Sequence, residues 1–266
     1  ETGFTVDEAG FKAEMKAQQV RARNARGDNE SMSSQKPDLM AFDTPSQFVY
    51  DHSPITAKVI ATFIDGVKCD EITTQGEIIL DQTTFYAEMG GQCADTGTMS
   101  NETTLLDVTY VSRAPRLQHL HVIKIKNGSV KVGDELILKV DAHKRALIQN
   151  NHTATHLLQK ALKTVLGEHV SQSGSYVDAE RLRFDFTHPQ KMTDEEIRKV
   201  EDQVNEQIFN GLNVQIEFMS KDEAMHSGAM ALFDEKYGDQ VRVVSVGDYS
   251  KELCGGCHVS NSAQIA

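Results

Sequence analysis

The sequence predicts an α+β protein, with a small antiparallel β-barrel followed by an α+β domain that holds a metal site between a helix and a C-terminal loop. Three observations predict this fold. Short β-type runs separated by turn signals fill residues 45–141. Beyond them, helical and strand patterns are mixed. Two pairs of metal-binding side chains, His152/His156 and Cys254/His258, lie in this second part.

The composition is that of a globular protein with room for two domains. With 266 residues, the chain can bury two ordinary hydrophobic cores. Hydrophobic residues make up 39% and charged residues 25%, and no apolar run approaches the roughly 18 residues that span a membrane. The sequence shows no signal peptide, and because its first residue is Glu1 rather than Met, we expect a piece of a longer polypeptide.

Cysteine usage and net charge restrict the compartment and the partners. Four cysteines are too few for a disulfide scaffold at this length, which favours a reducing compartment, the cytoplasm. The net charge of −12 argues against a general nucleic-acid binder, because neutralising phosphates requires clustered Lys and Arg. A nucleic-acid substrate would then be held by local patches or by the rest of the polypeptide.

Residues 1–44 are expected to form a helix and a linker. A capping-box pattern that begins at Thr5 precedes two apolar residues spaced four apart, and Gly27 would end the helix. The Lys and Arg residues of this helix favour a solvated face over an RNA contact. Residues 28–36, rich in Ser, Asn and Asp, are typical of an exposed linker.

Residues 45–141 are expected to form the barrel. Four runs with strand-type composition are bounded by turn signals such as Asp65-Gly66 and Asn127-Gly128. Their spacing suggests a small antiparallel barrel. The runs cover residues 57–64, 77–80, 117–125 and 135–140.

A glycine-rich motif, residues 85–97, lies inside this region. Its glycines, Gly90, Gly91 and Gly97, would let backbone N–H groups cradle a phosphate or a nucleotide end, or they would form a tight hairpin. On pattern alone, the hairpin is favoured.

Residues 142–266 are expected to combine helices with strands. Thr193 and Ser220 each begin a capping box, so each should start a helix. The first helix has one apolar face and should end at Gly211, and alternation in the residues after it predicts a half-buried strand. The apolar helix positions are Ile197, Val200, Val204 and Ile208, the strand positions are Leu212, Val214, Ile216 and Phe218, and a further strand is expected at residues 241–246.

The first ligand pair is expected on a helix. Residues four apart on an α-helix lie on one face, so His152 and His156 can bind a single ion. Leu158, Leu162 and Val165 would give this helix a buried stripe, with Gly167 as its end. Taken alone, such a histidine pair more often packs in a core than binds metal.

The second pair supplies the missing ligands. Gly255 and Gly256 let the backbone turn so that Cys254 and His258 can converge. Three imidazoles and one thiolate are ligands that zinc prefers, which predicts one Zn²⁺ per chain. A zinc that only joins the helix to the loop is the alternative.

Other chemistries of these motifs are less favoured. A zinc protease would need Glu after its first His ligand, where this chain has Thr153. The run from Cys254 to His258 also matches the haem-attachment pattern C-x-x-C-H, although nothing else suggests an exported protein. A redox dithiol formed with Cys257 would be expected at the start of a helix, whereas these residues follow a strand pattern.

Several ordered motifs resemble the editing domain of the alanyl-tRNA synthetase family. They include His-Thr-Ala-Thr-His-Leu-Leu at 152–158, and the glycine-rich motif resembles that of the family's preceding β-barrel. The resemblance covers nearly the whole chain. The opening segment, residues 6–11, resembles the connection from the family's tRNA-recognition region, which favours a part of a synthetase over a free-standing trans-editing protein. Further matching segments are residues 167–175, 181–186, 231–239 and 254–259.

The resemblance implies that the ester joining serine or glycine to the acceptor end of tRNA(Ala) is hydrolysed at a zinc site. It assigns Thr155 and Gln172 to recognition of the amino acid, and His152, His156, Cys254 and His258 to the metal. Zinc would either position groups or help to activate water. ATP and Mg²⁺ would serve only an aminoacylation domain elsewhere in the synthetase polypeptide.

Two departures from the family and one alternative remain. The family usually has Thr where this chain has Cys257, which adds a second thiol beside the ligands. The chain stops at Ala266, where the family continues into further strands and a C-terminal domain, so we expect a truncated editing domain. The alternative is a module that binds tRNA and holds a purely structural zinc.

Overall fold

The structure, a computed structural model, describes all residues except 1–6, 8–9, 12, 18–35, 52 and 231–239. Residues 10, 11 and 13–17 are helical, in agreement with the predicted N-terminal helix. The expected helix end at Gly27, most of the linker at 28–36 and the motif at 231–239 lie outside the described residues. Among the described residues, no helix is long and apolar enough to cross a membrane.

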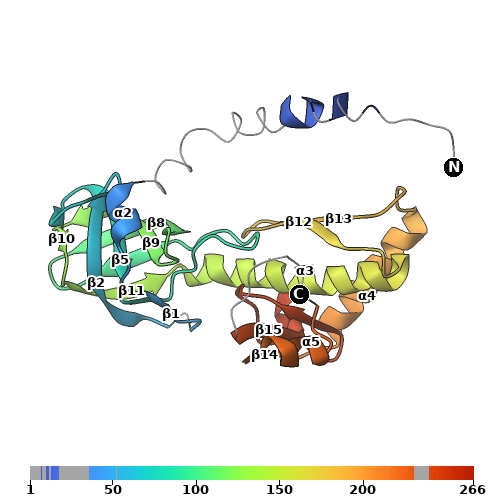
Figure 1. Cartoon of the computed structure of the whole chain (residues 1–266). Coiled ribbons are helices and arrows are strands. Elements are labelled where there is room, and N and C mark those ends of the chain that lie inside the picture. The colour runs from blue at the N-terminus through green and yellow to red at the C-terminus, as the bar shows by residue number, and fades with distance from the viewer. Residues whose placement is uncertain (1–6, 8–9, 12, 18–35, 52, 231–239) are drawn as a thin grey trace.

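The first half of the chain folds into a closed antiparallel barrel of six strands, as predicted. Each strand is paired with its two neighbours, and the pairing of β11 with β2 closes the sheet. The barrel appears at the left of Figure 1. Its strands, in spatial order, are β11 (Glu135–Val140), β7 (Gly97–Ser100), β8 (Leu105–Arg113), β9 (His119–Asn127), β5 (Gln75–Leu80) and β2 (Ile55–Ile64).

Short elements surround the barrel. Helix α2 (Pro37–Ala41) buries Leu39 in a small cluster with Phe63. The two-residue strands are β1 (Gln47–Phe48), paired with β6 (Gln82–Thr83), β4 (Glu71–Ile72), paired with β10 (Val130–Lys131), and β3 (Val67–Lys68), paired with β2.

The four predicted runs correspond to β2, β5, β9 and β11, and the sequence analysis missed β7 and β8. Strand β7 is only four residues long. In β8, a register shift between Val108 and Tyr110 interrupts the alternation of buried and exposed residues, which hides the strand period. The barrel interior is nevertheless continuous and apolar, and it includes Val59, Leu80, Met99, Leu106 and Leu136.

Helix α3 (Ala142–Leu166) leads out of the barrel and runs the length of the second half (Figure 1). The Asp141 side chain accepts a hydrogen bond from the Lys144 backbone N–H and so caps the first turn. The helix ends at Gly167 as predicted, because the φ of +114° there disfavours any residue with a side chain.

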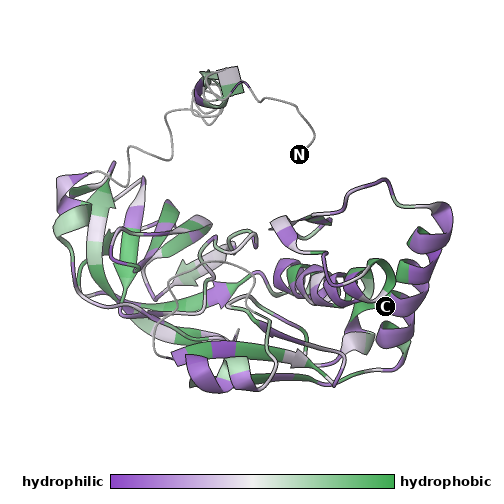
Figure 2. Ribbon diagram, turned by 45° about the vertical axis from the view of Figure 1, so that its right-hand side comes forward, coloured by the Kyte–Doolittle hydropathy of each residue, from purple (hydrophilic) through white to green (hydrophobic). Residues whose placement is uncertain are grey.

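Two layers flank α3 (Figure 1). On one side lies the hairpin of β12 (Gln172–Val177) and β13 (Leu182–Phe186), and on the other lies the three-stranded sheet of β14 (Val214–Ser220), β15 (Gln240–Val246) and β16 (Ser250–Leu253). Helices α4 (Asp194–Phe209) and α5 (Lys221–His226) both begin with the predicted capping boxes. A short 3₁₀ helix, η2 (Ser262–Ile265), ends the chain. Figure 2 shows hydrophobic residues gathered on the barrel strands and the second sheet, whereas α4 is mostly hydrophilic.

The expected half-burial of β14 is wrong at two positions. Ile216 is 43% exposed and Phe218 is 64% exposed. Strand β14 is the edge of its sheet, and α3 contacts β16 at the other edge. Helix α3 therefore does not cover the part of the sheet that carries Ile216 and Phe218.

A buried ion pair joins the barrel to α3. Arg145, in the first turns of α3, donates hydrogen bonds from Nε to Asp95 Oδ1 and from Nη2 to both Asp95 Oδ2 and the Thr84 carbonyl. Asp95 also accepts a hydrogen bond from the Tyr86 backbone N–H, and both charged side chains are about 99% buried. Such a pair stabilises little over an apolar pair of the same shape, but removing one partner leaves the other charge unpaired.

We expect Arg145→Met to lower the free energy of unfolding by about 3–5 kcal/mol, because Asp95 keeps its buried charge. The matched control is Arg183→Met, which removes an exposed pair with Asp185 and should cost less than about 1 kcal/mol. Urea unfolding measures both. Equal losses in the two variants would show that Arg145 does not join the two halves.

Candidate metal centre

Helix α3 brings the first pair of candidate ligands to one face. His152 is 7% exposed and His156 is 3% exposed, and their rings lie one helical turn apart with centroids separated by 5.6 Å. The neighbouring Thr155 is also buried, and its hydroxyl donates to the Asn151 carbonyl one turn earlier. The helical spacing of the sequence is therefore sufficient to bring these side chains together.

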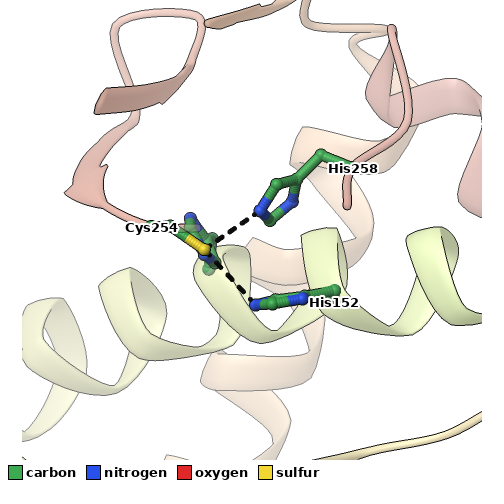
Figure 3. Close-up of side chains that lie close together, drawn as sticks. His152, Cys254 and His258 are labelled. Atoms are coloured by element: carbon green, nitrogen blue, oxygen red, sulfur yellow. Dashed lines mark hydrogen bonds between the residues drawn. The ribbon is translucent and has the colours of Figure 1, made fainter. Parts of the chain in front are cut away.

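The C-terminal loop brings the second pair to the same place. Cys254 follows β16 directly, and His258 lies at the end of the glycine turn (Figure 3). Cys254 Sγ lies 3.2 Å from His258 Nε2 and 3.5 Å from His152 Nε2. One ligand atom from each of the four residues, His156 included, lies within 4.8 Å of the others.

This donor set fits a tetrahedral zinc ion. With Zn–S and Zn–N bonds of about 2.3 and 2.0 Å, sulfur and nitrogen ligands of one tetrahedral ion lie roughly 3.5 Å apart. The two sulfur–nitrogen distances in the structure agree with that value. The four side chains could therefore hold zinc with little movement.

Burial also sets the protonation of these groups. Desolvation lowers the pKa of His152 to about 4, and desolvation, followed by the neighbouring imidazoles, lowers the pKa values of His156 and His258 well below their usual range. The imidazoles are therefore neutral near pH 7, which leaves their nitrogen lone pairs free for a metal. Burial raises the pKa of Cys254 to about 12, so this thiol must lose a proton when it becomes a ligand.

Gln92, from the glycine-rich motif, connects the barrel to this centre. It is fully buried, and its Oε1 accepts a hydrogen bond of 2.9 Å from the Cys257 backbone N–H. His152 Nδ1 lies 2.7 Å from the same oxygen and must therefore donate its proton to it. This hydrogen bond fixes the tautomer that leaves His152 Nε2 unprotonated and facing Cys254.

The other two imidazoles have comparable neighbours. His258 Nδ1 lies 3.1 Å from the hydroxyl of the buried Thr153, which also accepts from the Val259 N–H. His156 Nδ1 lies 3.6 Å from Glu252 Oε2, a longer separation than a hydrogen bond. Thr153, which argues against a protease, therefore also has a structural role beside His258.

Two further side chains hold the glycine turn. Arg242 donates a 2.6 Å hydrogen bond to the Cys254 carbonyl, and its guanidinium lies 4.1 Å from the ring centroid of Tyr50. The Tyr50 hydroxyl donates to the Gly255 carbonyl over 3.0 Å. A barrel-side tyrosine and a β15 arginine thus fix the backbone that carries two ligands.

A cavity of about 70 Å³ is lined by three of the four ligands, His152, His156 and Cys254. Thr155 and Gln172, the residues expected to recognise an amino acid, both line it, the first from α3 and the second from the start of β12. Gln159 and Glu252 line it as well. The structure thus brings the two predicted recognition residues to one cavity with the ligands, and their roles remain predictions.

The glycine-rich motif forms the tight turn favoured by its pattern. Met89 and Gln92 exchange backbone hydrogen bonds around Gly90 and Gly91, whose φ angles of +60° and +85° suit a two-residue hairpin turn. A Cβ on Gly91 would lie 2.6 Å from the Ser175 carbonyl of β12. Glycine here lets the barrel loop approach the cavity closely.

The haem interpretation conflicts with this geometry. It requires both thiols to face a porphyrin, whereas Cys257 is 3% exposed and the cavity beside Cys254 holds only about 70 Å³. Cys254 instead faces two imidazoles.

Sequence reasoning missed the residues that support the ligands. Gln92 was part of the glycine-rich motif, but its target lies 60 residues away. Glu252 stands two residues before Cys254, and an acidic residue so close to a candidate ligand in the sequence was the only signal available for it. Tyr50 and Arg242 carried no signal in the sequence pattern.

We expect Gln92→Ala to lower zinc affinity by roughly 10–100-fold, because His152 would lose the acceptor that fixes its tautomer. Chelator competition measures this affinity. Gln118→Ala is the matched control, since this buried barrel glutamine donates to the Phe42 and Thr44 carbonyls, and it should leave zinc affinity unchanged. Equal affinities for wild type and Gln92→Ala would contradict the role of Gln92.

Comparisons with known proteins agree on one family. The family model of class II (A) tRNA synthetases matches residues 1–144, and the model of the second additional domain of threonyl and alanyl tRNA synthetases matches residues 241–266. The chain is 51% identical to the alanine–tRNA ligase of Geobacillus thermodenitrificans over 268 residues, which cover 100% of this chain and 30% of that protein. It is 50% identical to the ligase of Listeria monocytogenes strain F2365 and 48% identical to that of Exiguobacterium sibiricum, with 99% and 98% of this chain and 30% of each relative covered.

The chain thus spans about 30% of the length of these relatives, and nearly all of it takes part in each match. One family model covers more than half of it, and the other covers the segment with Cys254 and His258. The chain therefore belongs to the alanyl-tRNA synthetase family.

Proposed function

We propose that this chain is the editing part of an alanyl-tRNA synthetase and that it hydrolyses tRNA(Ala) mischarged with serine or glycine. The observation that carries the proposal is the convergence of four ligand side chains, three of them buried, beside a small cavity that Thr155 and Gln172 line. In this proposal, residues 1–44 connect to the tRNA-recognition region, residues 45–141 form the barrel subdomain, and residues 142–266 form the editing domain.

The need for such a site follows from the limits of a binding pocket. A pocket built for alanine cannot strongly exclude glycine, which lacks one methyl, or serine, which adds one hydroxyl, because such differences are worth only about 1–3 kcal/mol. A second, hydrolytic site can correct both errors. The family membership of the chain supports this purpose, since the relatives are alanine–tRNA ligases.

Zinc is the proposed cofactor, held by His152, His156, Cys254 and His258. Four protein ligands would close the coordination sphere, so a zinc ion held there would position the loop and the groups around the ester, or help to activate water if one ligand moved away. The remaining work belongs to the protein. Thr155 and Gln172 bind the amino acid, and the walls of the cavity limit the size of the side chain that can enter. Serine adds a hydroxyl that such polar groups can bind, whereas the methyl of alanine offers them no hydrogen bond.

The partners follow from the same assignment. The acceptor end of tRNA(Ala) would enter the cavity, and the rest of the synthetase polypeptide would supply much of the tRNA affinity, because the net charge of this chain is −12. ATP and Mg²⁺ would be needed only for aminoacylation elsewhere in that polypeptide. The compartment we propose is the cytoplasm.

We expect the zinc-loaded chain to release serine from seryl-tRNA(Ala) faster than alanine from alanyl-tRNA(Ala). Cys254→Ala and His156→Ala should each lower the rate of serine release by at least about tenfold, roughly 1.4 kcal/mol of transition-state free energy. The matched control is His143→Ala, an exposed histidine in the first turn of the same helix, which should keep the wild-type rate.

Three outcomes separate the alternatives. Unchanged rates in both ligand variants would contradict the metal-centre assignment. Binding of tRNA(Ala) without any hydrolysis would favour a binding module with structural zinc. A rate of serine release from the isolated chain that equals the rate from the same chain joined to the rest of a synthetase would favour a free-standing trans-editing protein.

A further inference from the structure

Three residues that line the cavity carry buried polar atoms without a hydrogen-bond partner in the described part of the chain. Among the described residues, no hydrogen-bond partner exists for Gln159 Oε1 and Nε2, Glu252 Oε2 or His156 Nδ1. Gln159 is 1% exposed, Glu252 is fully buried, and all three side chains line the cavity beside the ligands. A buried polar atom without a partner costs about 1–3 kcal/mol, and a charged one costs more. Such a cluster therefore points to a polar guest.

The backbone that holds the ligands also holds this cluster. Gln159 follows Thr155 by four residues and His156 by three, so it continues their face of α3 by one turn. Glu252 is paired with Val244 in the sheet, and Ser250 donates a 2.8 Å hydrogen bond to its other oxygen, Oε1. Oε2 is thereby left for the cavity, 3.6 Å from His156 Nδ1.

We propose that Glu252 and Gln159 form a subsite for the α-ammonium group of an aminoacyl ester. An ammonium group has three N–H donors and a positive charge. Glu252 Oε2 and Gln159 Oε1 each supply an acceptor, and the Thr155 hydroxyl oxygen, whose proton points to Asn151, is a third candidate. A cavity of about 70 Å³ has room for such a small group.

The subsite rests on the proposed function. It explains how the site could bind an ester of glycine, which has no side chain. Glycine has no side chain to recognise, but it carries the same α-ammonium group beside the ester carbon as serine. A site that holds the ammonium group places the ester of both substrates at the ligands. Recognition of the hydroxyl by Thr155 and Gln172 then adds affinity for serine.

The test uses two amide analogues that cannot be hydrolysed. One is 3′-deoxyadenosine carrying an L-seryl group on a 3′-amine, and the other has a hydroxyl in place of the α-ammonium group. Calorimetry on the zinc-loaded chain should show that the ammonium analogue binds at least about tenfold more tightly, because charge-assisted hydrogen bonds are lost in the other.

The variants Glu252→Gln and Gln159→Leu should each reduce this preference to within about threefold, while zinc content stays at one equivalent. The matched control is Gln203→Leu on α4, a partly buried glutamine that also has an unpartnered carbonyl oxygen but does not line the cavity. It should keep the wild-type preference. Because the Gln159 side chain makes no hydrogen bond among the described residues, its variant gives an answer even where Glu252→Gln disturbs folding or zinc binding.

The two hypotheses fail in different ways. Equal binding of the analogues to the wild-type chain, or an unchanged preference in Gln159→Leu, would overturn the ammonium subsite and leave the editing proposal standing. Equal binding of the two analogues would mean that ordered water, and not an ammonium group, forms hydrogen bonds with the side chains of Gln159 and Glu252. Failure of the wild-type chain to bind either analogue would overturn the editing proposal together with the subsite.

Discussion

The hydrogen bonds to Gln92 Oε1 are the interaction on which the centre depends. This single oxygen accepts from His152 on α3 and from the Cys257 backbone in the C-terminal loop, while its own backbone belongs to a turn of the barrel. Three segments that lie far apart in the sequence therefore meet at one buried atom. The Asp95–Arg145 ion pair fixes the barrel to α3 a few residues away, so the approach of Gln92 is rigidly defined.

Burial explains why this meeting point suits a cation. Each imidazole is desolvated and held neutral, the Cys254 thiol is protonated, and Glu252 Oε2 has no hydrogen-bond partner among the described residues. Burial also raises the pKa of Glu252, to about 8. A metal ion would relieve this cost at the ligands, and a cationic substrate group would relieve it beside Glu252 and Gln159. The same desolvation thus accounts for both sites.

Local patterns predicted what local forces determine. The spacing of His152 and His156, the end of α3 at Gly167, and the capping boxes at Thr193 and Ser220 each depend on residues within about one helical turn, and all are present. Gln92 and Glu252 reach their partners only through tertiary packing, and no periodicity reports that. Phe218 is exposed because α3 packs near β16 and leaves β14 uncovered, and this too depends on tertiary packing. Strand β8 was missed because its bulge breaks the period.

The central claim is a single metal centre built from one thiolate and three imidazoles. X-ray absorption at the zinc edge tests it most directly, on the chain loaded with one equivalent of zinc. The account predicts a first shell of one sulfur and three nitrogen scatterers, with the sulfur lost in Cys254→Ser. A first shell with two sulfurs would assign Cys257 to the metal, and one of oxygen alone would place zinc elsewhere. Either result would contradict the account.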